Sequence, residues 1–244
     1  MNKKLYILSI ILLTVILAVS TFFITSYYLD DKEQTEQFES LIEIMDKNEN
    51  RSKNNKYADL YSQNNDFIGW ISIDGTNINY PVMQSKDNPN FYLKHNFEKK
   101  YSDYGVPYMS ESCNIGDSDN LIIYGHNMRT KKMFADLCKY KDRNFYEQHK
   151  IIIFDTLNDN SKYEIIATFK TVAYSNSGFK YYEFTNAYTE NDFSAYIEKC
   201  KALSFYDTGV SAKYGDKLIT LSTCEYSRTN GRMVVVAKRI NSPE

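Results

Sequence analysis

The chain has 244 residues, a formal net charge of −2 and a mean hydropathy of −0.51. The near-neutral charge and the lack of a basic stripe exclude a protein that binds nucleic acid by electrostatics. The polar average, in spite of an apolar N-terminal run, means that the remaining chain is distinctly polar. That remainder is long enough for one domain with a sizeable core.

Residues 5–29 contain no charged side chain and form the apolar run. A helix needs about 20 apolar residues to cross the hydrocarbon core of a bilayer, so this run predicts a transmembrane anchor. Lys3 and Lys4 precede the run, and acidic residues follow it. The positive-inside rule therefore predicts that residues 1–4 are cytoplasmic and that the chain after residue 29 is extracellular, in a single-pass cell-membrane protein.

A cleaved signal peptide is the alternative interpretation of the same run. Such peptides carry an apolar region of about 7–15 residues followed by a cleavage site between small residues. The apolar run here is longer, and its small residues, 18–20, lie inside it. These features favour an uncleaved anchor.

Residues 30–63 are predicted to form a helical linker or N-terminal helices, and residues 64–244 the extracellular domain. Apolar residues recur at helical spacing near the start of the linker, a polar break covers 48–55, and a second short helix is expected around residues 57–61. A solvated stalk and a packed N-terminal helical cap are both compatible with this pattern.

The pattern changes to short strands after Phe67. Asp74 and Gly75 separate two apolar segments and predict a hairpin. Helices are expected at residues 132–140 and 190–203. The predicted strands cover residues 68–73, 77–82, 121–124, 151–154, 163–171, 217–222 and 233–237. Many short strands with turns between them indicate a mainly β fold, a barrel or sandwich with added helices.

Cys224 is the candidate nucleophile, at the end of the strand predicted from Lys217. Successive side chains of a strand alternate between its two faces, so Cys224 shares a face with Leu218 and Ser222. If the other, more apolar face packs on the core, Cys224 lies on the opposite face with its thiol partly exposed, as a reactive thiol requires. A buried, inert cysteine is the alternative.

Arg232 is the candidate partner of this thiol. Residues 225–231 form a loop, and an antiparallel return of the chain would place Arg232 beside Cys224, where it could stabilise an oxyanion. Arg228 is the rival, but it lies in mid-loop, where its side chain is less well fixed.

His126 is the candidate acid and base, because it follows the apolar strand at residues 121–124. The other two histidines, His95 and His149, lie in polar stretches and are interpreted as surface residues. A thiol, an imidazole and a guanidinium together suffice for acyl transfer through a thioester.

The chain shows no pattern of a metal or cofactor site, so none is expected: it has no CxxC, no HExxH and no clustered histidines. Four cysteines in an extracellular domain permit disulfides, but their irregular spacing suggests no framework. Cys138 and Cys200 lie in predicted amphipathic helices and are expected to be buried thiols.

The segment 220–224 (TLSTC), with His126 and Arg232, resembles the signature of sortases, the cysteine transpeptidases of Gram-positive cell surfaces. Segments 66–71, 80–84 and 124–127 are also similar to sortases, so the resemblance covers the chain from about residue 64 onward. It is greatest to class B, which has N-terminal helices and a helix in the loop before the cysteine strand. The resemblance implies a closed eight-stranded β-barrel.

The resemblance also implies a reaction. Cys224 would attack the threonine carbonyl of a C-terminal sorting motif in a surface protein, and His126 would protonate the leaving amine. An amine of peptidoglycan, or of its lipid-linked precursor, would then resolve the thioester, while Arg232 stabilises the oxyanion. Ser222, Glu225 and Asn88 are implied to line the substrate groove.

Three alternatives stay open at this point. A pilin polymerase would use a substrate lysine in place of the peptidoglycan amine, and a thiol hydrolase would need no amine. An anchored extracellular binding module would have an inert Cys224. The sequence also does not assign whether the thiol and imidazole are neutral or form an ion pair, because coupled groups titrate together.

Overall fold

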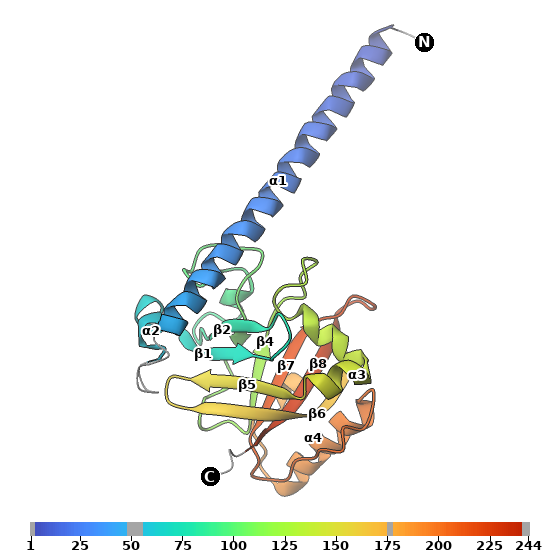
Figure 1. The fold of residues 1–244 in the computed structure, drawn as a ribbon. Coiled ribbons are helices and arrows are strands. Elements are labelled where there is room, and N and C mark those ends of the chain that lie inside the picture. The colour runs from blue at the N-terminus through green and yellow to red at the C-terminus, as the bar shows by residue number, and fades with distance from the viewer. Residues whose placement is uncertain (1–2, 48–55, 175–177, 241–244) are drawn as a thin grey trace. The chain divides into compact units, whose positions relative to one another are not determined.

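The computed structural model describes residues 3–47, 56–174 and 178–240. The chain divides into two compact units, Met1–Glu43 and Ile44–Glu244. The first unit consists of a helix and the second contains the β-barrel (Figure 1).

Helix α1 (Lys3–Lys47) is one continuous helix that covers both the predicted anchor and the first part of the predicted linker. By length and composition it can cross a membrane. Ser and Thr side chains within residues 5–29 donate hydrogen bonds to carbonyls three or four residues earlier, for example Thr21 Oγ1 to Leu17 O at 2.8 Å. Such bonds satisfy the hydroxyl groups within the helix itself. The predicted polar break at 48–55 lies outside the described residues.

Eight strands form a closed barrel in the described part of the second unit, in the order β1-β2-β3-β4-β7-β8-β6-β5. The strands are β1 (Phe67–Ser72), β2 (Asn79–Met83), β3 (Tyr108–Met109), β4 (Asn120–Tyr124), β5 (Ile151–Thr156), β6 (Asn160–Val172), β7 (Leu218–Cys224) and β8 (Gly231–Ile240). All seven predicted strands are present, and the eight-stranded barrel is confirmed. The two-residue strand β3 was not predicted, because so short a segment shows no alternation.

The helices of the barrel unit are short, except for α4. They are α2 (Ala58–Gln63), η2 (Phe91–Leu93), η3 (Ala135–Lys141), α3 (Arg143–Gln148), η4 (Tyr181–Glu183) and α4 (Glu190–Leu203). Helix α4 has the predicted bounds and begins with a capping box, in which Thr189 and Asp192 satisfy each other's main-chain N–H groups. The helix predicted at residues 132–140 is instead the 3-10 helix η3, which starts later, and α3 follows it unpredicted.

Strand β7 is buried on both faces except at its last residue, because side chains from the segment between β6 and β7 cover the face that bears Thr220 and Ser222. Tyr181 and Ser222 share a hydrogen bond of 2.6 Å between their hydroxyl groups. Tyr196 of α4 similarly approaches Thr220, at 3.4 Å. The face bearing Ser222 is therefore covered, and the strand becomes accessible only at its end, where Cys224 is partly exposed as predicted.

Candidate functional site

The carboxyl ends of β4 and β7 bring His126 and Cys224 to one edge of the barrel. The two strands run parallel, and their register ends with Tyr124 opposite Ser222. His126 and Cys224 each lie two residues beyond this pair. Because parallel strands end at the same edge, the register confirms the predicted placement of His126 near Cys224.

Strands β7 and β8 place Arg232 directly opposite Cys224, as the antiparallel return predicted. The Nη1 atom of Arg232 donates to the carbonyl of Gly231 at 3.0 Å. Its guanidinium carbon lies 5.9 Å from the ring centre of Tyr174, close enough for a cation–π contact. Arg228 is exposed in the loop, so the structure favours Arg232 as the arginine beside the thiol.

A cavity of about 690 Å³ opens at this edge of the barrel, and His126, Cys224 and Arg232 all line it. Ser222 lines it as well. Glu225 and Asn88 are not among its lining residues. The substrate-binding roles of Ser222, Glu225 and Asn88 stay predictions.

Sequence reasoning missed several residues that shape this cavity. Tyr174, Tyr181 and Asn90 line it, and Asn90 accepts a hydrogen bond of 2.8 Å from the Tyr108 hydroxyl. Asn90 has a φ of 61°, in the left-handed region that asparagine tolerates. Asn88, the residue that the resemblance implied for the groove, lies two positions before Asn90.

The imidazole of His126 is held by a main-chain carbonyl. Its Nε2 atom lies 2.7 Å from the oxygen of Leu93. A carbonyl oxygen can only accept, so Nε2 carries the proton and, in the neutral ring, Nδ1 is free to accept one. A main-chain acceptor such as Leu93 O has no sequence signature, so this bond could not be predicted from the sequence.

Burial lowers the pKa of His126 below its ordinary value. The hydrogen bond to Leu93 acts in the opposite direction. Of the two charges nearby, Lys94 lowers the pKa and Asp103 raises it. These two residues form an ion pair of 2.7 Å with each other. The net result favours the neutral imidazole.

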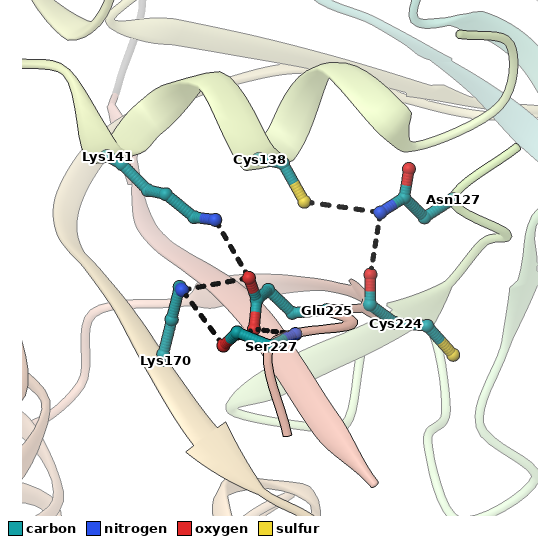
Figure 2. A network of polar contacts seen from close by, with 7 residues as sticks. All are labelled: Asn127, Cys138, Lys141, Lys170, Cys224, Glu225 and Ser227. Carbon is teal, nitrogen blue, oxygen red and sulfur yellow. Dashed lines mark hydrogen bonds and ion pairs between the residues drawn. The ribbon is translucent and has the colours of Figure 1, made fainter. Parts of the chain in front are cut away.

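Cys224 is half-buried. The carbonyl and the N–H of the peptide link between Cys224 and Glu225 both form hydrogen bonds. Its carbonyl accepts from Asn127 Nδ2 at 2.9 Å (Figure 2). The N–H of Glu225 donates to Gly231 O at 2.9 Å. This N–H is therefore already engaged, and the Arg232 guanidinium is left as the charged donor opposite the thiol.

The carboxylate of Glu225 is buried in a cluster of charges instead of lining the cavity. It pairs with Lys141 at 2.9 Å and Lys170 at 2.8 Å, and it accepts from Ser227 (Figure 2). Burial alone would raise the pKa of Glu225, but the hydrogen bonds from Lys170, Ser227 and Lys141 lower it to about 2. Glu225 is therefore a buried, charged residue that ties the start of the loop after Cys224 to two lysines.

The four cysteines are free thiols. Cys113 and Cys200 are fully buried, and burial raises their pKa values to about 11 and about 12. Cys138 is only half-buried, so its predicted burial was wrong: its side of η3 faces Asn127, which donates to its sulfur at 3.4 Å. In the described ranges, no group of three or more His, Cys, Asp or Glu residues could hold a metal ion.

The sequence matches known proteins over most of its length. The Sortase domain family matches residues 71–240. Sortase B of Staphylococcus aureus is 34% identical over 239 residues, which cover 94% of this chain and 94% of that protein. Sortase B of Listeria monocytogenes is 36% identical over 196 residues, which cover 79% of this chain and 77% of that protein.

Solved structures agree with the sequence matches. A Staphylococcus aureus sortase B–substrate complex superposes with a TM-score of 0.79 at 31% identity, covering 88% of this chain and 100% of that chain. Clostridium perfringens sortase B superposes with a TM-score of 0.69 at 34% identity, covering 75% of this chain and 99% of that chain. Relatives at this identity and coverage share both the fold and the enzyme class, so the chain belongs to the sortase family of cell-wall transpeptidases and is a cysteine transpeptidase.

Proposed function

We propose that this transpeptidase cleaves a C-terminal sorting motif after threonine and attaches the released protein to an amine of peptidoglycan or its lipid-linked precursor. One observation carries the proposal: three separate elements place His126, Cys224 and Arg232 around a single cavity. A sortase B among the relatives was solved in complex with triglycine, a peptide whose free amine has the chemistry of such an acceptor.

In the first half-reaction, the neutral imidazole of His126 takes the thiol proton of Cys224 at Nδ1 as sulfur attacks the threonine carbonyl. The carbonyl oxygen becomes an oxyanion, and Arg232 stabilises it. The C–N bond then breaks, and His126 passes the proton that it took from Cys224 to the leaving amine. A thioester between Cys224 and threonine remains, with its charge and protons balanced.

In the second half-reaction, the neutral amine of the acceptor attacks the thioester carbonyl, and His126 removes the amine's proton. Arg232 again stabilises the oxyanion. The C–S bond breaks, sulfur takes the proton from His126, and a new amide links the threonine to the acceptor. Of the residues proposed to bind the motif, Ser222 is the one that lines the cavity, and we keep it as a groove residue.

The test is cleavage of quenched fluorescent peptides of the NPxTx and xPxTG types by the full-length chain in detergent, with and without triglycine. Cleavage after threonine and a triglycine adduct are expected. Cys224→Ala should abolish both, whereas Cys138→Ser, which alters a neighbouring half-buried thiol, should keep them. Cleavage that persists in Cys224→Ala would overturn the assignment of the nucleophile. Release of product without an adduct would indicate a hydrolase, and an adduct formed only with a lysine side chain would indicate a pilin polymerase.

We also propose that residues 5–29 of α1 anchor the enzyme, with residues 1–4 cytoplasmic, residues 30–63 as a linker and residues 64–244 as the extracellular catalytic domain. The supporting observation is that α1 is long and apolar enough to span a bilayer. Protease added to intact protoplasts should digest the catalytic domain and leave a membrane fragment that begins at Met1. An N-terminus beyond residue 20 on the mature protein would show signal-peptide cleavage instead.

A further inference from the structure

Beyond the last paired residues of β4 and β7, further hydrogen bonds join the two segments that follow these strands. Main-chain pairing in the register ends at Tyr124 and Ser222. The N–H of Gly125 then donates to Ser222 O at 3.1 Å. The Thr223 hydroxyl donates to Gly125 O at 2.7 Å. The connection between the two strand ends therefore continues toward the catalytic residues.

Asn127 extends this connection beyond His126 and Cys224. Its amide donates to the carbonyl of Cys224 at 2.9 Å. In return, the Tyr226 hydroxyl donates to Asn127 O at 3.0 Å. The residue after the histidine is thus tied to both the nucleophile and the residue two positions after it.

The bond from Asn127 is well placed to orient the nucleophile. It holds the oxygen end of the peptide link between Cys224 and Glu225, while Gly231 holds the N–H end. With both ends fixed, the plane of this link cannot rotate, and the Cα–Cβ bond of Cys224 keeps its direction. Figure 2 shows the Cys224 sulfur directed away from Asn127, so the amide acts on the main chain and does not touch the thiol.

We propose that Asn127 is a positioning residue that locks the main chain of Cys224 to the loop carrying His126, so that thiol and imidazole stay aligned. This inference rests on the proposed function. A side-chain amide suits the role because its nitrogen has two hydrogens, one for the Cys224 carbonyl and one toward the Cys138 sulfur at 3.4 Å. An aspartate in the same place would set an oxygen against the carbonyl oxygen.

The test uses the full-length chain with Asn127→Ala, Asn127→Gln and Asn144→Ala. Asn144 is exposed on α3 and outside the network, which makes it the matched control. Asn127→Ala should lower kcat for peptide cleavage by about 10- to 100-fold and leave KM within about twofold, because misalignment affects the reacting atoms more than substrate binding. Asn127→Gln keeps the donor and should recover part of kcat.

Amide hydrogen exchange gives a second readout that needs no substrate. Asn127→Ala should exchange faster at residues 224–231, and Asn144→Ala should match the wild type there. Unchanged kcat, or unchanged exchange in this segment, would overturn the proposal. If Asn127→Ala does not fold, Asn127→Asp, which loses the amide donor at nearly the same size, decides by the same two measurements, and wild-type kcat and exchange in it would overturn the proposal. A wild-type enzyme that cleaves no peptide would refute the proposed function. Amide hydrogen exchange at residues 224–231 would then decide whether Asn127 holds the Cys224 main chain.

Discussion

Cys224 and Arg232 form a directly opposed cross-strand pair on β7 and β8. The next pair along the ladder, Glu225 and Gly231, shares a main-chain hydrogen bond. Hydrogen-bonded and non-hydrogen-bonded pairs alternate in antiparallel strands, so Cys224 and Arg232 occupy a non-hydrogen-bonded pair, where Cα atoms are about 4.5 Å apart and side chains lie closest. The register thus sets the guanidinium beside the position where an oxyanion would form.

Arg232→Ala should lower kcat by about 10²- to 10³-fold with little change in KM, because an oxyanion donor acts mainly in the transition state. Arg232→Lys should recover only part of the loss, since an ammonium lacks the planar fork. Steady-state cleavage of a sorting peptide measures both. Arg228→Ala, which removes an exposed arginine of the loop before β8, serves as control. A rise in KM alone in Arg232→Ala would assign Arg232 to substrate binding.

The acid limb of kcat/KM should lie below pH 6.5, because burial lowers the pKa of His126 from its ordinary value of about 6.5. As pH falls through this pKa, the imidazole gains a proton and can no longer accept one from Cys224. Lys94→Gln removes a cation that disfavours the imidazolium, so its limb should move to higher pH. Asp103→Asn removes an anion that favours the imidazolium, so the acid limb of this variant should move to lower pH. Shifts in the same direction in the two variants would contradict this account.

Glu225→Gln should destabilise the fold by about 1–3 kcal/mol in urea unfolding, because it removes the buried partner of Lys141 and Lys170. The effect should depend on pH. The pKa of Glu225 is lowered to about 2 in the folded chain, below about 4.3 for an unfolded glutamate. This stabilisation is therefore present above about pH 4.3 and is lost as the pH falls toward 2.

A surface carboxylate offers the matched control for Glu225. Glu147 also pairs with two cations, Arg143 and Lys150, but on the exposed surface. Solvent screens exposed pairs, so Glu147→Gln should shift the urea midpoint much less than Glu225→Gln. Equal shifts in the two variants would show that burial adds nothing to the Glu225 cluster.

Gly125→Ala should reduce both stability and activity. A Cβ at this position would meet Cγ of the fully buried Phe134 at 2.6 Å, so the main chain next to His126 must shift. The melting temperature and kcat should both fall. Phe134→Ala removes the Cγ and Cδ atoms that the new Cβ would meet, so Gly125→Ala should cost less in a Phe134→Ala background than in the wild type. Equal costs in the two backgrounds would rule out this contact as the cause.

The sequence was sufficient to predict the strands and the pairing of Arg232 with Cys224, because each depends on local patterns. Alternating apolar residues gave the strands, and the short loop at residues 225–231 implied the antiparallel return that pairs Arg232 with Cys224. Apolar residues at helical spacing within 190–203 likewise predicted α4.

The features that the sequence did not predict depend on contacts between distant segments. The burial of both faces of β7 comes from Tyr181 and Tyr196, which approach from the preceding connection. The acceptor for His126 is the main-chain oxygen of Leu93, 33 positions earlier in the chain. The pairing of Glu225 with Lys141 of η3 and Lys170 of β6 likewise joins segments far apart in the chain.

The position of β8 in the barrel determines when during synthesis the enzyme can become active. β8 is the last strand of the chain, yet it lies between β7 and β6 in the barrel. Before β8 emerges, β7 has no partner on that side and Cys224 has no arginine opposite it. Closing the barrel and pairing Cys224 with Arg232 are therefore one event, and a nascent or truncated chain that ends before Gly231 lacks the arginine proposed to stabilise the oxyanion.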